Sequence, residues 1–301
     1  MWTRPLAPPR IVDTGAAPAV AADGPATEMP RGEAPHEANE GQEQAPPTSV
    51  RFRIATYNVH GCMGTDGRIE EGRIAAVLRD IDADVVALQE LDVGRTRSAR
   101  SDQPRHLADA LGMGLHFCES VRRGEELYGH ALLSRGPLRL VRAARLPPLR
   151  WPRNGEPRSA LWADVEVGSQ RVTILTTHLG LSPVERHVHT TALLGEDWMG
   201  SPAFRGPRVF CGDLNVNSGS RTYQRLRGSL RDVQREAFGR RTRPTFPAVF
   251  PMLRLDHVFV SEELRVRRVE VVTTALSRIA SDHLPLTVDV EMALPPPGRL
   301  S

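Results

Sequence analysis

Apolar and polar residues follow one of two patterns along most of the chain, one typical of strands and the other of helices. Arg51–Asn58 alternates between the two kinds of residue, and the next clear segment, Asp84–Glu90, is almost wholly apolar until it ends in an acid. Both segments are predicted to form strands. In contrast, Ile74, Val77 and Leu78 have helical spacing and predict an amphipathic helix over 69–79. By the same criteria we expect further strands over 113–118, 130–134, 138–145, 158–166, 171–178, 207–212, 255–260, 265–273 and 284–291, and helices over 104–111, 183–199 and 219–227.

The order of these elements indicates a fold class. Strands outnumber helices, and several strands follow one another with no helix between them. A doubly wound parallel sheet needs a helix after nearly every strand, so this order argues against one. We therefore expect an α/β fold in which two mixed sheets pack together between helices.

The first 49 residues show neither the strand pattern nor the helical pattern. Residues 1–50 contain nine prolines and a single aromatic residue, Trp2. Such a segment buries too little apolar surface to offset the entropy lost on ordering. We expect a disordered tail over 1–49, one catalytic domain over 50–294 and a disordered end over 295–301.

Composition narrows the class of protein. No run of about 18 apolar residues exists, which excludes a transmembrane helix. The three cysteines are too scattered for a disulfide framework, and we expect a cytoplasmic protein. All 39 basic residues are arginine; the predicted tail carries −4 and the remainder +7, which is compatible with a polyanionic substrate.

Polar side chains stand where the predicted strands end or begin. Their types are carboxylate, carboxamide and imidazole, the groups that bind metals or move protons. They are Asn58, Glu90, His178, Asp213, Asn215, Asp256 and the pair Asp282-His283. Because strand ends on one rim of a sheet converge, we expect these groups to line a single cleft.

The chemistry of this set favours a hard cation. Carboxylate and carboxamide oxygens suit Mg²⁺, or Mn²⁺ as an alternative, better than zinc. The one closely spaced histidine pair, His187 and His189, is expected on the surface of the helix at 183–199. No glycine-rich nucleotide motif and no Gly-x-Ser-x-Gly elbow is present. Metal-assisted attack of water on a phosphoester is the chemistry that fits.

Six short motifs, in this order, resemble those of the endonuclease/exonuclease/phosphatase superfamily, which includes deoxyribonuclease I, exonuclease III and the neutral sphingomyelinases. The motifs are Thr56-Tyr-Asn58-Val-His-Gly61, Leu88-Gln-Glu90, Thr177-His178-Leu, Gly212-Asp213-Leu-Asn215, Arg254-Leu-Asp256-His and Ser281-Asp282-His283. The resemblance spans 56–283. It implies a four-layer α/β/β/α sandwich and Mg²⁺-dependent hydrolysis of phosphoester bonds.

The resemblance also implies roles for the metal side of the site. Glu90 would be the principal ligand of Mg²⁺, and Asn58 and Asp282 would lie close to the ion. Asp213 would orient the attacking water.

On the phosphate side, the resemblance gives His283 the task of activating or orienting the water, or of holding the phosphate, with Asp256 paired to its other nitrogen. Asn215 would donate to a phosphoryl oxygen. His178 would serve the leaving group.

Two further positions are weaker candidates. Glu119 ends a predicted strand and is expected to orient His178. His130, in Tyr128-Gly-His130-Ala-Leu-Leu-Ser, stands where the sphingomyelinase-like members have asparagine. We expect it to be tolerated at the edge of the cleft, with tuning of a phosphate contact as the alternative.

The substrate class stays open at this stage. A nucleic acid is the first expectation, because arginine-rich stretches such as Arg95–Arg100 suit a phosphate backbone. A phospholipid head group is the alternative, for which Trp151, Trp162 and the loop Phe246–Phe250 are the candidate exposed apolar residues. A catalytically inactive binding module is less expected because the key acids and the terminal histidine are present. Nothing implies an obligate protein partner, and we expect a monomer.

Overall fold

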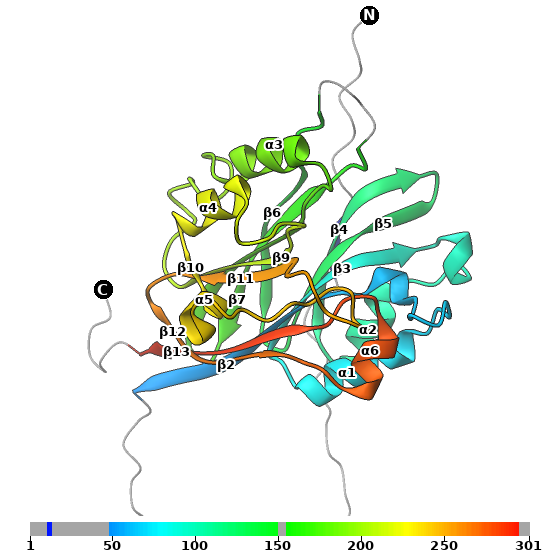
Figure 1. Cartoon of the computed structure of the whole chain (residues 1–301), viewed down its shortest axis with the longest axis horizontal. Coiled ribbons are helices and arrows are strands. Elements are labelled where there is room, and N and C mark those ends of the chain that lie inside the picture. The colour runs from blue at the N-terminus through cyan, green and yellow to red at the C-terminus, as the bar shows by residue number, and fades with distance from the viewer. Residues whose placement is uncertain (1–10, 14–47, 150–154, 295–301) are drawn as a thin grey trace, which may run out of the picture.

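Two β-sheets pack face to face at the centre of the molecule, and helices cover their outer faces (Figure 1). The computed structural model describes residues 11–13, 48–149 and 155–294. Trp151, the whole predicted C-terminal end and most of the predicted tail lie outside the described residues.

The first sheet has seven strands in the order β1-β4-β5-β3-β2-β13-β12. Only β2 and β3 run parallel, and every other neighbouring pair is antiparallel. The strands are β1 (Ile11–Asp13), β2 (Ser49–Asn58), β3 (Val85–Val93), β4 (Gly114–Arg123), β5 (Glu126–Ser134), β12 (Leu264–Val271) and β13 (Leu286–Ala293).

The second sheet has six strands in the order β10-β11-β9-β8-β7-β6. It too contains a single parallel pair, β8 with β9. The strands are β6 (Leu138–Arg145), β7 (Ser159–Val167), β8 (Gln170–His178), β9 (Arg208–Asp213), β10 (Arg231–Asp232) and β11 (Asp256–Val260).

Helices close the sandwich on both sides. Those on the first sheet are α1 (Glu71–Ile81), α2 (Gln103–Leu111) and α6 (Ala275–Ala280). Those on the second are α3 (Pro183–Leu193) and α4 (Arg221–Arg227), while α5 (Val233–Phe238) packs on β11 and β12. Short 3-10 turns, η1 (His60–Cys62) and η2 (Thr96–Ser98), follow β2 and β3. None of the described helices is long and apolar enough to cross a membrane.

Three apolar clusters occupy the three spaces between these layers. Ile54 and Val85 of the first sheet meet Ile174 and Val209 of the second in the central cluster. A second cluster lies under α1 and α2, and a third lies under α3 and α4. This layering confirms the predicted α/β/β/α sandwich.

Some local expectations need correction. The helix predicted over 183–199 ends at Leu193, because a turn follows in which Gly195 accepts the backbone bond from Trp198. Trp198 packs into the outer cluster from that turn, so its apolar side chain prolongs the helical pattern without extending the helix.

Other differences concern single residues and short elements. Trp162 is buried and so cannot be an exposed apolar anchor. His189 is also buried, and only His187 of that pair is exposed. Ile11–Asp13, in the stretch expected to be disordered, pairs antiparallel with β4. The sequence pattern also missed α5 and α6, which have six residues each.

Candidate active site

Each sheet contributes its one parallel strand pair to the same rim of the sandwich. Asn58 at the end of β2 stands opposite Gln89, next to Glu90, and His178 at the end of β8 stands opposite Asp213. Because parallel strands point the same way, their carboxyl ends lie side by side. The antiparallel strand β11 begins where β9 ends, so Asp256 stands opposite Asp213.

The segment before β13 joins this rim through backbone and hydroxyl bonds. Ser281 Oγ donates to the carbonyl oxygen of Asn58 (2.8 Å), and the backbone N–H of Ala248 donates to the carbonyl oxygen of Asp282 (2.6 Å). These contacts place His283 beside Asp256. The predicted convergence of strand ends is therefore present in the structure.

Asn58 links the two sheets at the floor of the site. Its Nδ2 donates to Glu90 Oε1 (2.8 Å) and to Asp213 Oδ2 (3.0 Å), while its Oδ1 accepts from the backbone N–H of His60 (3.0 Å). Glu90 lies within a register shift between β3 and β5 and has a φ of +63°. Such bulges redirect a side chain and concentrate at functional sites.

His283 is held by a carboxylate. Its Nδ1 lies 2.8 Å from Asp256 Oδ2, which also accepts from Thr245 Oγ1 (2.6 Å). Burial lowers the pKa of His283, but the charge of Asp256 and this hydrogen bond outweigh burial and raise it to about 10. Its Nε2 faces Asp213 Oδ2 at 3.7 Å.

His178 is held by a cation instead. Its Nδ1 lies 3.0 Å from Nη1 of the buried Arg158. Burial and then the charge of Arg158 lower the pKa of His178 well below its usual value. Its Nε2 lies 3.5 Å from Asp213 Oδ2 and 3.1 Å from Asn215 Nδ2.

Asp213 lies between the two histidines. Burial raises the pKa of its carboxyl to about 7, against the opposing effect of His283. Its Oδ1 accepts the backbone N–H of Asn215 (2.9 Å), a residue with a φ of +50°. The carboxylate is thus fixed by the turn that follows β9.

Carboxylate oxygens and ring nitrogens gather closely enough to hold a divalent ion. Ligand atoms of Glu90, His178 and Asp213 lie within 4.8 Å of one another, and so do those of Asp213, Asp256 and His283. The side chain of Glu90 is 21% exposed and is therefore reachable from solvent. Two carboxylates in the first set make a donor group that fits a hard cation.

The predicted metal ligands are only partly brought together. Glu90 and Asn58 are in contact, but Asn58 presents its nitrogen to the carboxylates because its oxygen is taken by His60. Asp282 belongs to neither close cluster, and its Oδ1 lies 3.7 Å from His60 Nδ1.

The two weaker candidates differ in outcome. Glu119 does not orient His178: its carboxylate binds Arg122 and Arg145, and Arg158 takes the position at His178 Nδ1. His130 is buried with Nδ1 3.4 Å from Ser159 Oγ, and burial lowers its pKa to about 3.

Sequence reasoning missed Arg158 and Thr245. A signal for Arg158 existed: it directly precedes β7, whose start pairs with the end of β8, so it lies next to His178. Thr245 reaches Asp256 from a loop whose course the sequence pattern does not define.

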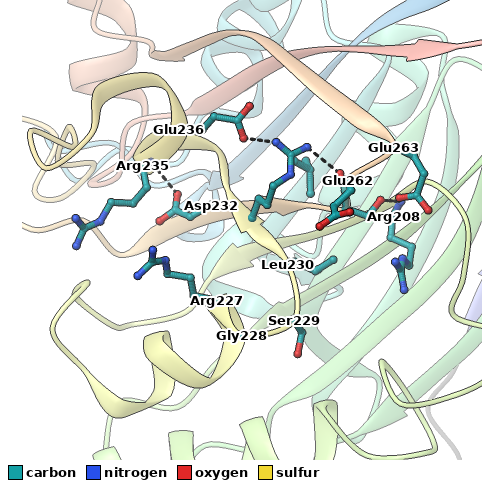
Figure 2. Close-up of a pocket in the computed structure, with 13 residues that line it drawn as sticks. Arg208, Arg227, Gly228, Ser229, Leu230, Asp232, Arg235, Glu236, Glu262 and Glu263 are labelled. Carbon is teal, nitrogen blue, oxygen red and sulfur yellow. Dashed lines mark hydrogen bonds and ion pairs between the residues drawn. The ribbon is translucent and has the colours of Figure 1, made fainter.

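A cavity of about 610 Å³ lies at the other end of the second sheet (Figure 2). Its lining includes Arg208 at the start of β9 and Val260 at the end of β11, whereas the rim holds the opposite ends of these strands. Within it, Arg231 donates to Glu236 (2.5 Å). It shares no residue with the rim.

The model of the endonuclease/exonuclease/phosphatase family matches residues 55–283. The chain belongs to this family. The resemblance carried by the six motifs is therefore confirmed.

Individual relatives agree with this assignment. The uncharacterised protein YbhP of Escherichia coli K12 is 24% identical over 257 residues, which cover 80% of this chain and 96% of YbhP. An endonuclease/exonuclease/phosphatase of Beutenbergia cavernae is similar in structure, with a TM-score of 0.66, 25% identity and coverage of 81% of this chain and 72% of that one. The human Nocturnin catalytic domain, solved with a bound sulfate anion, has the same fold (TM-score 0.61, 21% identity, 80% of this chain and 94% of that one).

Proposed function

We propose that this member of the family is a Mg²⁺-dependent phosphodiesterase that cleaves its substrate by in-line attack of water, with Mn²⁺ as a second usable ion. The observation that carries the proposal is the position of Asp213, which lies within 4 Å of the Nε2 atoms of both His178 and His283. A carboxylate between two imidazoles offers a proton acceptor with hydrogen-bond donors on either side.

Glu90 would hold the ion, and Asn58 fixes both its carboxylate and that of Asp213. When bound, the cation polarises a phosphoryl oxygen and neutralises the charge that develops on it. Every other task falls to side chains of the rim.

Asp213 takes the proton of the attacking water. Its pKa of about 7 suits a base that works near neutral pH. His283 is protonated at that pH, because Asp256 stabilises its charged form. Its Nε2–H therefore donates a charge-assisted hydrogen bond to the phosphoryl group. His178 and Asn215 face the same space from the other side, and both would donate to an oxygen of the reacting phosphate group.

Nucleic acid is the substrate we favour. Arg97 and Arg95 both bind the buried carboxylate of Asp92, and Arg97 is close enough to Glu90 for their charges to interact. Both guanidinium groups lie over the ring of Tyr128. Arginine side chains fixed near Glu90 suit the phosphate next to the one that is cleaved.

A phospholipid head group is the second candidate. Val249, Phe250, Met252 and Leu253 form an exposed apolar group in the loop that begins at Phe246. The ring of Phe246 lies 4.9 Å from that of His283, so this loop borders the site. Exposed apolar groups of this kind suit a lipid surface.

A substrate panel tests both candidates. We expect Mg²⁺-dependent hydrolysis of bis-p-nitrophenyl phosphate and of plasmid DNA or RNA, abolished by EDTA and restored by added Mg²⁺. Sphingomyelin vesicles distinguish the second candidate. The matched control is Asp213→Asn, which keeps the shape of the side chain and removes the base. Equal activity in Asp213→Asn, or no hydrolysis of any substrate with either metal, would overturn the proposal.

A further inference from the structure

The ring of His178 is faced by a hydrogen-bond donor at each nitrogen. Nη1 of Arg158 lies 3.0 Å from Nδ1, and Nδ2 of Asn215 lies 3.1 Å from Nε2. A guanidinium has no acceptor. The amide of Asn215 is oriented by a second bond, from Nδ2 to the carbonyl oxygen of Leu179 (3.0 Å), so its nitrogen faces the ring.

A neutral imidazole accepts at one nitrogen and donates at the other. One of the two contacts must therefore bring two donors together. The question is which contact accepts a hydrogen bond and which does not.

The charge of Arg158 makes its contact the one in which His178 accepts a hydrogen bond. The side chain of Arg158 is 6% exposed, and its Nη1 is also paired with Glu156 Oε1 (2.8 Å), which holds this charged donor beside the ring. A charge-assisted bond is roughly twice as strong as the neutral bond from the amide. Nδ1 therefore accepts from Arg158, and Nε2 carries the hydrogen.

We propose that Arg158 is a positioning residue that holds His178 in the Nε2–H tautomer, so that His178 and Asn215 present two N–H donors to one anionic oxygen of the substrate. This inference deepens the proposed function and rests on it. Two donor nitrogens 3.1 Å apart both come within ordinary hydrogen-bond length of a single oxygen placed above them. The pair thus stabilises charge on that oxygen by hydrogen bonding, and His178 keeps its proton.

Arg158→Met and Arg158→Lys form a matched pair of tests. Both replacements have unbranched side chains of similar length, but only lysine donates a hydrogen bond. The first readout is the tautomer of His178, taken from long-range ¹⁵N–¹H spectra of the full chain with Mg²⁺ and assigned by the signals lost in His178→Gln. The second is kcat on bis-p-nitrophenyl phosphate.

We expect the Nε2–H tautomer in the wild-type protein and in Arg158→Lys. In Arg158→Met, Asn215 is the remaining donor, so the hydrogen should move to Nδ1. Because one donor to the developing charge is then lost, kcat should fall by about 10²-fold, while Arg158→Lys should stay within about tenfold of wild type. Arg171→Met serves as a control, since this arginine lies on the same strand as His178 and is 61% exposed.

The wild-type spectrum alone can overturn the inference, whether or not the variants fold, because an Nδ1–H tautomer contradicts it. An unchanged tautomer with near-normal kcat in Arg158→Met would also contradict it, as would equal losses in both variants with no change of tautomer. The tautomer is measured without substrate. A protein with the expected tautomers but no hydrolysis of any phosphodiester would therefore refute the proposed function alone.

Discussion

His283 and His178 lie on either side of the same buried carboxylate and differ in what holds their second nitrogen. His283 Nδ1 meets Asp256 at 2.8 Å, whereas His178 Nδ1 meets Arg158 at 3.0 Å. Both rings are almost fully buried, so burial disfavours the charged form of each. The partner therefore decides the outcome: the pKa of His283 is raised to about 10, and that of His178 is lowered well below its usual value.

This difference shows how one residue type supplies two kinds of hydrogen bond within a single site. In the proposed function, His283 would be a cation that attracts a phosphoryl oxygen, and His178 would be a neutral donor in a fixed tautomer. The residue that contacts Nδ1 therefore sets the role of each ring: Asp256 for His283 and Arg158 for His178.

The largest expected effect comes from removing the charged ring. His283→Ala should lower kcat by about 10²–10⁴-fold, because the donor to the phosphoryl group and the partner of Asp213 are both lost. The melting temperature should also fall, because the buried Asp256 loses its charged partner, so turnover is compared at a temperature where the variant is folded. Turnover close to wild type would place His283 outside the reaction.

A smaller effect is expected from Asp256→Asn, which leaves the ring and weakens its charge. Turnover should fall by less than in His283→Ala, and the double variant should resemble His283→Ala, since both residues act as one unit. Kinetic constants of the two single variants and the double variant give this comparison. Losses that multiply in the double variant would show that Asp256 acts apart from His283.

The smallest effects are in stability, and the two histidines should give them opposite signs. His283 binds its proton more tightly in the folded state, so its contribution is complete below pH 6.5 and is lost as pH rises from about 6.5 to 10. His178 is neutral when folded, so its contribution is lost as pH falls below about 6.5. Each slope is at most about 1.4 kcal/mol per pH unit.

Urea unfolding in EDTA at several pH values measures these slopes. His283→Gln should remove the loss of stability on the alkaline side, and His178→Gln should remove the loss on the acid side. The same change of slope in both variants would mean that the two rings do not differ as described.

The sequence predicted the rim well because its signals are local. An apolar strand followed at once by His178 or Asp213 places that residue at a strand end, and the sheet topology then gathers the ends. The strand predicted to end at Glu90 continues to Val93, and Glu90 reaches the rim from the register shift inside β3. The layered fold followed from the order of strands and helices. Short elements such as α5 and α6 have too few residues to show a period.

The side-chain contacts that each rim residue makes could not be predicted in the same way. Glu119 lies inside β4 at a register shift with β5, and Arg158 directly precedes β7; the direction of each side chain decides which of them reaches His178. Arg122 and Arg145 bind Glu119 and neutralise it, so the carboxylate is not free for the histidine. Asp282 precedes His283 directly, yet it points toward His60. The spacing of these residues in the sequence predicts neither contact.

The central claim is that the two histidines differ in protonation, and a side-chain ¹⁵N titration of the metal-free protein from pH 5.5 to 8.5 tests it most directly. We predict that His283 keeps hydrogens on both ring nitrogens throughout, because Asp256 raises its pKa above this range. His178 should stay neutral throughout, with its hydrogen on Nε2. Two rings that lose a proton together near pH 6.5 would contradict the account.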